Sequence, residues 1–264
     1  TSLGVFRPQN TTVHFAGNTT KTLYMPNSSI NGSRLNNVVV EDGGLLRTYA
    51  DSRPYIYGNF TLTDTARTSL YDAEVRLNTT VNPGTTLGAT TFTNGLELTV
   101  AEGGSVSATH VYMATRLPQS AGNYNVTTTH LTGQVVLTED REETFSHLVI
   151  ESSALVYLTG DASSLILNGQ VTHNTNGTSN SGLRVGTGHT VTINGIANFN
   201  GTGTMSGSLW TGGDLYFTGN VNVQNTSLGV FRPQNTTVHF AGNTTKTLYM
   251  PNSSINGSRL NNVV

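Results

Sequence analysis

The 264-residue chain contains no cysteine, only two lysines and few charged residues of any kind. Without cysteine there is no disulfide framework, no thiolate zinc site and no thiol nucleophile. Charged residues make up 11% of the sequence and the formal net charge is -2, whereas roughly 25% of an ordinary globular protein is charged. No stretch is basic enough to neutralise a run of phosphates, which argues against nucleic-acid binding through a charged groove.

Long apolar runs and helical periodicity are also missing. No window approaches the length of about 18 apolar residues that a membrane-spanning helix needs. Gly, Asn and Thr interrupt almost every helical pattern, and the best exception is residues 64–77, where we expect a short helix or a decorated loop. Uncharged polar residues are abundant instead: residues 1–225 hold 38 Thr, 18 Ser and 22 Asn. This composition is typical of a secreted, β-rich protein and argues against a cytosolic enzyme.

The two ends of the chain carry the same sequence. Residues 1–39 and 226–264 match at all 39 positions, with an offset of 225. Either the chain is a window on a longer array with this period, or the protein starts and stops here with a copied end. The second copy stops inside an expected strand, where a natural terminus would leave unpaired backbone groups, and this favours the array. We therefore predict one repeat unit over 1–225 and the start of the next identical unit over 226–264.

Two short apolar patterns recur along the chain and predict strands. One is apolar-x-apolar before small residues, as in residues 98–100 before AEGG, and the other is apolar-x-apolar-x-Gly, as in residues 191–195. The spacing of two places both apolar side chains on one face of a strand, and the Gly or Ser that follows permits a bend. The residues that we expect to point inward are Val13, Phe15, Val38, Val40, Leu98, Val100, Leu148, Ile150, Leu165, Leu167, Val191, Ile193, Leu215 and Phe217.

Short strands that end in bends admit two all-β folds. One is a right-handed parallel β-helix (a β-solenoid) made of tandem repeats, and the other is a pair of antiparallel β-sandwich domains. Six Asn-Gly pairs in residues 1–225 are hairpin signals that favour the sandwich. The recurring strand-and-bend pattern, with ladder-forming Thr, Ser and Asn at the outward positions, favours the β-helix. We predict the β-helix, in which one repeat would advance ~35–50 Å along the axis at the strand spacing of about 4.8 Å.

Three stretches carry a resemblance to known proteins. They are the segment that begins TTVHFAGNTTKTLYMPNSS at Thr11, the segment TFSHLVIESSALVYLTGDASSLILNGQV, and GLRVGTGHTVTINGIANFNG. This style of repeat resembles that of large secreted surface proteins of bacteria and archaea, which are similar to filamentous-haemagglutinin and autotransporter-passenger adhesins. Those adhesins are parallel β-helices. The resemblance implies a β-helical adhesin, filament or sheath protein at a microbial cell surface, although residues 64–95 and 114–130 fit it poorly.

Parallel β-helices include polysaccharide lyases and hydrolases, whose sites need clustered acidic groups. The densest acidic cluster here consists of Glu139, Asp140, Glu142 and Glu143 around Arg141. It could supply a carboxylate pair or bind a cation, but the sequence TEDREET lacks apolar alternation, so we expect a solvated loop. Three acidic residues in two predicted bends could also touch a cation, although they do not follow the nonapeptide calcium repeat; they are Glu41, Asp42 and Glu102.

The remaining candidates for chemistry are histidines and one tryptophan. None of the histidines has the spacing of a metal site, and we expect outward, surface positions for them. The single Trp210 could stack on a sugar with Tyr216 nearby, but we expect it in a corner or in the core. The sequence therefore predicts no catalytic residue, no metal and no cofactor. The histidines are His14, His110, His130, His147, His173, His189 and His239.

Asn-x-Ser/Thr sequons are frequent. Residues 1–225 hold ten, against about six expected from the composition, an excess consistent with N-glycan acceptors. The alternative is that Asn and Thr abound as turn and ladder residues. The sequons lie at Asn10, Asn18, Asn27, Asn31, Asn59, Asn78, Asn125, Asn176, Asn200 and Asn225, and at Asn235, Asn243, Asn252 and Asn256 in the second copy.

Together these features predict a non-enzymatic, extracellular structural protein. Its identical repeats would associate end to end into a filament, rod or sheath on a microbial cell. The expected partners are copies of the same repeat and N-glycans, with no nucleic acid and no membrane span in this segment. Two alternatives stay open: an adhesin stalk that binds a host or a polysaccharide, and a carbohydrate-active β-helix enzyme or phage tailspike.

Overall fold

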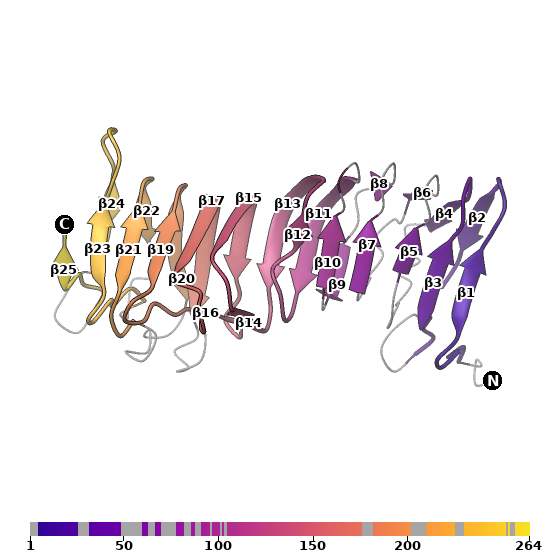
Figure 1. The fold of residues 1–264 in the computed structure, drawn as a ribbon, viewed down its shortest axis with the longest axis horizontal. Coiled ribbons are helices and arrows are strands. Elements are labelled where there is room, and N and C mark those ends of the chain that lie inside the picture. The colour runs from indigo at the N-terminus through magenta and orange to yellow at the C-terminus, as the bar shows by residue number, and fades with distance from the viewer. Residues whose placement is uncertain are drawn as a thin grey trace. The chain divides into compact units, whose positions relative to one another are not determined.

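The protein is an all-β parallel β-solenoid, and no helix occurs among the residues that its computed structural model describes (Figure 1). The chain divides into two compact units, residues 1–127 and residues 128–264. The described residues are 5–25, 32–48, 60–62, 67–69, 78–81, 86–87, 91–95, 97–100, 102, 105–175, 182–201, 210–224, 230–251, 253 and 257–264.

Every strand pairing within these ranges is parallel, which confirms the β-solenoid and excludes the antiparallel sandwich. Each strand pairs with the strand in the same place of the neighbouring turn, as Leu62 does with Val81 and Val156 with Leu183. For this reason the Asn-Gly pair at residues 168–169 closes no hairpin and lies inside a single strand.

In the first unit the strands alternate between two parallel sheets. One sheet has the order β1 (Thr12–Phe15), β3 (Asn37–Val40), β5 (Phe60–Leu62), β7 (Asn78–Val81), β10 (Glu97–Val100) and β12 (Gln119–Ser120). The other has the order β2 (Thr20–Leu23), β4 (Leu45–Thr48), β6 (Arg67–Ser69), β8 (Thr86–Leu87) and β11 (Ser105–Met113), and β9 (Thr91–Gly95) also pairs with β11. The expectation of a helix is wrong for β6, because pairing with β4 and β8 satisfies its backbone groups; the rest of residues 64–77 lies outside the described residues.

The second unit begins within β13 (Asn123–Leu131). Its longest sheet continues with β15 (Arg141–Ile150), β17 (Ser164–Thr175), β19 (Thr190–Ile193), β21 (Asp214–Phe217), β23 (Thr237–Phe240) and β25 (Asn262–Val263). A branch runs from β17 through β20 (Ala197–Gly201) and β22 (Val221–Val223) to β24 (Leu248–Tyr249). A third sheet contains β14 (Gln134–Leu137), β16 (Leu155–Leu158) and β18 (Gly182–Leu183).

Inward apolar residues of successive turns form columns. Leu165 lies beside Val191, and Val191 lies beside Leu215, and all three are fully buried. Twelve of the fourteen predicted inward residues are confirmed as buried. The other two, Val13 and Phe15, are half-buried, because β1 pairs with β3 alone among the described strands.

A column of glycines marks one bend of the second unit. Gly169 lies within β17 with φ 109°, and Gly195 and Gly219 follow β19 and β21. A Cβ added to Gly195 would collide with the carbonyl group of Gly169, and one added to Gly219 would collide with that of Gly195. The backbones of successive turns therefore approach too closely here for any side chain. This contact explains the glycine of the pattern apolar-x-apolar-x-Gly at residues 169, 195 and 219, whereas a Cβ at Gly17 would have open space around it.

The two copies of the repeated sequence make the same strand pairing. In the first copy Thr12 pairs with Asn37 and Val13 with Val38. In the second copy β23 pairs with β25 in the identical register, with Thr237 opposite Asn262. A backbone hydrogen bond outside the strands is repeated as well. The Arg34 N–H donates to the Phe6 carbonyl at 2.8 Å, and in the second copy the equivalent N–H, that of Arg259, donates to the Phe231 carbonyl at 3.0 Å.

Candidate functional site

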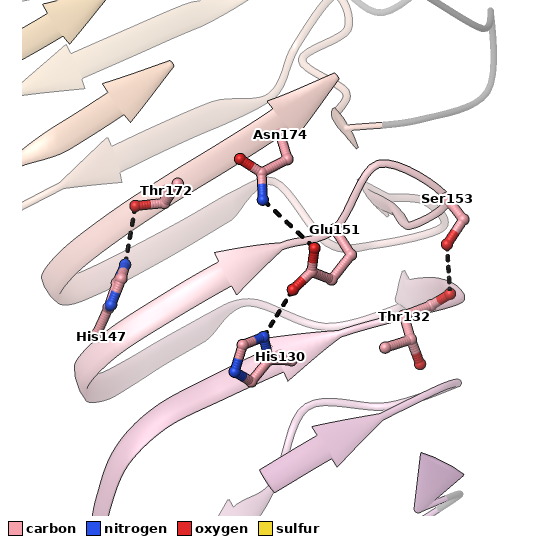
Figure 2. Close-up of polar contacts among 7 residues, drawn as sticks. All are labelled: His130, Thr132, His147, Glu151, Ser153, Thr172 and Asn174. Atoms are coloured by element: carbon pink, nitrogen blue, oxygen red, sulfur yellow. Dashed lines mark hydrogen bonds and ion pairs between the residues drawn. The ribbon is translucent and has the colours of Figure 1, made fainter. Parts of the chain in front are cut away.

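Polar side chains form a row across β13, β15 and β17 (Figure 2). Nδ1 of His130 lies 2.6 Å from Oε1 of Glu151, and Nδ2 of Asn174 donates to Oε2 of Glu151 at 3.3 Å. The hydrogen bond with His130 is the main reason that the pKa of Glu151 falls below its ordinary value, with a further contribution from Asn174 and against the effect of partial burial. Both carboxylate oxygens are therefore engaged, and Glu151 links three neighbouring turns.

A second row lies beside it and continues over later turns. Nε2 of His147 lies 2.8 Å from Oγ1 of Thr172 (Figure 2). Asn198 donates to Thr172 at 3.4 Å, and Asn222 donates to Asn198 at 3.0 Å. Burial, together with the nearby charge of His130, lowers the pKa of His147. This row is a side-chain ladder of the kind that the sequence predicts.

A third, more exposed ladder runs from β15 and β17 to the residues that directly follow β19 and β21. Asn168 donates to Glu142 at 3.0 Å, Asn194 donates to Asn168 at 2.8 Å, and Thr218 donates to Asn194 at 3.1 Å. The last two bonds join equivalent positions of adjacent turns, whereas the bond from Asn168 to Glu142 is diagonal, because Asn168 lies opposite Thr144. Individual exposed hydrogen bonds stabilise a protein weakly, by about 0.5–1.5 kcal/mol, but a ladder repeats the contribution at every turn.

The acidic cluster is part of this architecture, and the expectation of a solvated loop is wrong for most of it. Residues 141–143 begin β15 and pair with residues 165–167 of β17, because the parallel ladder overrides the missing apolar alternation. Arg141 forms ion pairs with Glu143 and, at 3.2 Å, with Glu139. Burial raises the pKa of Glu143, while Arg141 opposes that rise.

Asp140 binds the backbone of the neighbouring turn. Its Oδ1 accepts hydrogen bonds from the backbone N–H groups of Ser163 and Ser164 at 2.7 and 2.8 Å, and these bonds lower the pKa of Asp140. Glu142 binds Asn168, and Glu139 and Glu143 bind Arg141, so all four acidic side chains have named partners within the fold. Within the ranges that the structure describes, no group of three His, Asp or Glu residues could hold a metal ion.

The histidines differ in burial. His14 is exposed and its Nδ1 lies 2.8 Å from Glu41, one of the acidic residues expected in a bend. Five others are half-buried: His110, His130, His147, His189 and His239.

His173 contradicts the expectation of a surface position. It is 2% exposed, its ring lies 5.6 Å from that of Phe199, and neither of its ring nitrogens has a hydrogen-bond partner among the described residues. Burial lowers the pKa of His173 to about 4. The signal that could have placed it is the spacing Val171-x-His173, which in the next turn becomes Ala197-x-Phe199 on the buried strand β20.

Trp210 is fully buried, which confirms its predicted core position. It belongs to an aromatic cluster, which we define as Phe199, Trp210, Phe217 and Phe231. The Phe231 ring lies 4.4 Å from that of Phe199 and 5.3 Å from that of Trp210, and Phe217 lies 6.0 Å from Phe199. Since Phe231 belongs to the second copy and the other three rings to the first repeat, this cluster marks their junction.

A second aromatic contact lies at the same junction. Tyr216 of the first repeat stacks on His239 of the second copy, with the ring centres 4.1 Å apart and an interplanar angle of 8°. Tyr216 is therefore engaged with the next turn and does not lie free beside Trp210 for a sugar ring.

Among the sequon asparagines whose burial the structure describes, five are exposed and one is not. Asn200 is half-buried at the end of β20, and its Oδ1 is buried without a hydrogen-bond partner in the described part of the chain. Asn78 lies on β7. The exposed ones are Asn10, Asn18, Asn125, Asn235 and Asn243. The other sequons lie outside the described residues: Asn27, Asn31, Asn59, Asn176, Asn225, Asn252 and Asn256.

No family model, no curated protein and no solved structure matches this chain. Among the described residues there is also no helix of the length and apolarity that crossing a membrane requires. Any functional conclusion therefore depends on the geometry of the chain itself, of which the junction between the two copies is the most informative part.

Proposed function

We propose that this protein is a structural, extracellular protein whose identical repeats stack into a filament, rod or sheath on a microbial cell surface, and that it carries N-glycans. In this proposal the role is mechanical and not enzymatic. The stacked backbone ladders and the buried apolar columns carry the load. The resemblance to secreted β-helical adhesins supports the extracellular location.

The observation that carries the proposal is the continuity of the sheet from the first repeat into the second. β21, which belongs to the first repeat, pairs in parallel with β23 of the second copy, from Asp214–Thr237 to Phe217–Phe240. β23 then pairs with β25 in the register that β1 and β3 have in the first copy. Stacking of identical units thus needs no change of fold at the junction. Such nearest-neighbour stacking is how solenoid proteins extend.

Electron microscopy and intact mass of the native material test the proposal. We expect uniform filaments with an axial repeat in the range ~35–50 Å for each repeat unit, formed by a polypeptide heavier than the 28.0 kDa of this chain. A native polypeptide of that mass, in particles without an axial repeat, would contradict the proposal.

A further inference from the structure

Three arginines follow one another along the third sheet of the second unit and its continuation. Arg184 comes directly after β18 and lies between the buried residues Leu183 and Val185, so its side chain points outward. Arg232 also lies between two buried residues. All three arginines are half-buried. We call this set the arginine row: Arg184, Arg232 and Arg259.

Backbone contacts place the row along the solenoid axis. Val185, next to Arg184, pairs with Trp210 of the following turn. A backbone hydrogen bond then joins the Trp210 carbonyl to the turn that holds Arg232. The Arg259 N–H donates to the carbonyl directly before Arg232 at 3.0 Å, which sets Arg259 opposite Arg232 in a parallel ladder. At about 4.8 Å for each turn, the row has gaps of about 10 Å and about 5 Å. Arg184 and Arg232 have a described turn on both sides, so their positions do not depend on an end of the chain.

The acidic residues of the second unit lie elsewhere. Residues 128–264 contain five basic and seven acidic residues, so this unit is negative as a whole. None of the seven acidic residues lies on a strand of the third sheet. Three of the five positive charges are thus gathered on a face whose strands carry no acidic residue, which makes the local potential positive. The acidic residues are Glu139, Asp140, Glu142, Glu143, Glu151, Asp161 and Asp214.

Partners inside the fold satisfy most of the acidic residues but not this row. Six of the seven acidic side chains have a named partner, as Asp214 has in His239 at 2.7 Å. Within the described ranges, no acidic side chain forms an ion pair with Arg184 or Arg232. Nε of each of these two arginines is buried, without a hydrogen-bond partner in the described part of the chain. The charge of neither guanidinium is therefore met by this chain, and an anion from outside would meet it.

The neighbouring turns hold one end of the row in place. Cζ of Arg184 lies 5.2 Å from the ring centre of Tyr157, and Nε2 of Gln134 donates to the Tyr157 hydroxyl at 2.8 Å. Val136 is 39% exposed and lies opposite Tyr157. A guanidinium that already packs on an aromatic ring loses less side-chain freedom when it binds a ligand. The face therefore offers apolar contact beside positive charge, which complements a sugar that carries a carboxylate.

We propose that the arginine row binds a linear acidic polysaccharide, with carboxylate groups of its sugar units meeting the guanidinium groups along the solenoid axis. A guanidinium donates two parallel N–H bonds to one carboxylate. A single file of charges suits a single extended chain. Each exposed contact is weak, so the affinity comes from several contacts along one polymer. The inference goes beyond the proposed function, because it names a partner other than the chain itself, and it does not require filaments.

The test measures binding of the full chain to immobilised polygalacturonate by biolayer interferometry, with dextran as the neutral polysaccharide. We expect binding to polygalacturonate and none to dextran. Binding should weaken as NaCl is raised, because salt screens contacts between exposed charges. An unaltered chain that does not bind polygalacturonate at low salt overturns the inference.

Substitutions then ask whether the row is the site. We expect Arg184→Gln, Arg232→Gln and Arg259→Gln each to weaken binding about two- to five-fold, and the triple variant to weaken it about tenfold or more. Lys246→Gln is the matched control. It removes the same charge from the second unit, but Lys246 lies shortly before β24, in the branch of the longest sheet, and we expect its binding to equal that of the unaltered chain.

Far-UV circular dichroism identifies the variants that keep the fold, and the single variants serve if the triple variant loses it. The equivalent residues of the first copy, Arg7 and Arg34, stay unchanged in every variant. Folded arginine variants that bind as tightly as the unaltered chain overturn the inference, as does an equal loss in Lys246→Gln. Self-association at low salt that depends on the row, without binding to polygalacturonate, would also overturn it and would assign the row to the acidic residues of a second copy.

These outcomes are separate from those of the proposed function. Binding that depends on the row, with native material that forms no filaments, would support the polysaccharide site and overturn the proposed function. Native filaments together with folded arginine variants that bind normally would do the reverse.

Discussion

The alternation of buried and exposed positions on β14 allows a sharp test with two neighbouring valines. Val135 is fully buried and Val136 is 39% exposed, and they pair with Val156 and Tyr157 of β16. Val135→Ala and Val136→Ala remove the same two methyl groups from the same strand, on opposite faces. Any change of intrinsic strand preference is thus nearly the same in both variants, and the difference between them measures burial.

The magnitude follows from burial. Removing two buried carbons costs about 1.6 kcal/mol in transfer free energy, at ~0.8 kcal/mol for each, and the cavity that remains adds to this cost. We expect Val135→Ala to lower the free energy of unfolding by about 2 kcal/mol and Val136→Ala by roughly 0.5 kcal/mol, within the range of surface substitutions.

Equilibrium denaturation followed by Trp210 emission measures both values, because Trp210 and both valines lie in the second unit. The unfolding curves of the two variants should share their slope and differ in midpoint. Equal losses, or a larger loss for Val136→Ala, would refute the reasoning, since a strand shifted by one residue exchanges its two faces.

Three further predictions concern the glycine column, the buried histidine and the sequons. Gly195→Ala should lower the midpoint of denaturation more than Gly188→Ala does, because a Cβ at Gly195 meets the Gly169 carbonyl whereas the space around Gly188, with φ 80°, is open. Because the pKa of His173 is low in the folded chain, the unfolded chain binds a proton between about pH 4 and 6.5 that the folded chain does not bind. The free energy of unfolding should therefore fall as the pH drops through this range, by up to about 3 kcal/mol. In His173→Phe this part of the dependence should vanish from denaturation midpoints measured at pH 4 to 7. Glycopeptide mass spectrometry should find the half-buried Asn200 bare and glycan on exposed sequons, namely Asn10, Asn18, Asn125, Asn235 and Asn243.

Much of the fold could be predicted from local patterns. A spacing of two between apolar residues determines which side chains share a face. This was sufficient to predict that Leu165, Val191 and Leu215 point inward, which their burial confirms; that they form one column follows from the strand register. The glycine after such a strand predicts a bend, and in the column of Gly169, Gly195 and Gly219 the close backbone contact gives its physical reason. Trp210 was placed in the core because a large ring gains more from burial than from exposure.

The errors came from residues whose environment is set by neighbouring turns. Residues 141–143 lack apolar alternation, yet they form a strand because β17 offers a complete row of backbone partners. His173 is polar, yet it occupies an inward position beside Phe199. The hydrogen bonds that join Glu151 to His130 and Asn174 connect different turns of the solenoid, and no local pattern sets which of these side chains meet.

The sequence by itself determined the β-rich class, the inward columns and the repetition of one end of the chain at the other, because each depends on residue type and on spacing along the chain. Only the tertiary structure decided between parallel turns and antiparallel hairpins, since both bury the same alternating residues and differ in which distant backbone groups pair. It alone also distinguished Phe6 from Phe231. Two identical sequences cannot differ in local preference, so the exposure of one and the burial of the other depend entirely on the turn that packs against them.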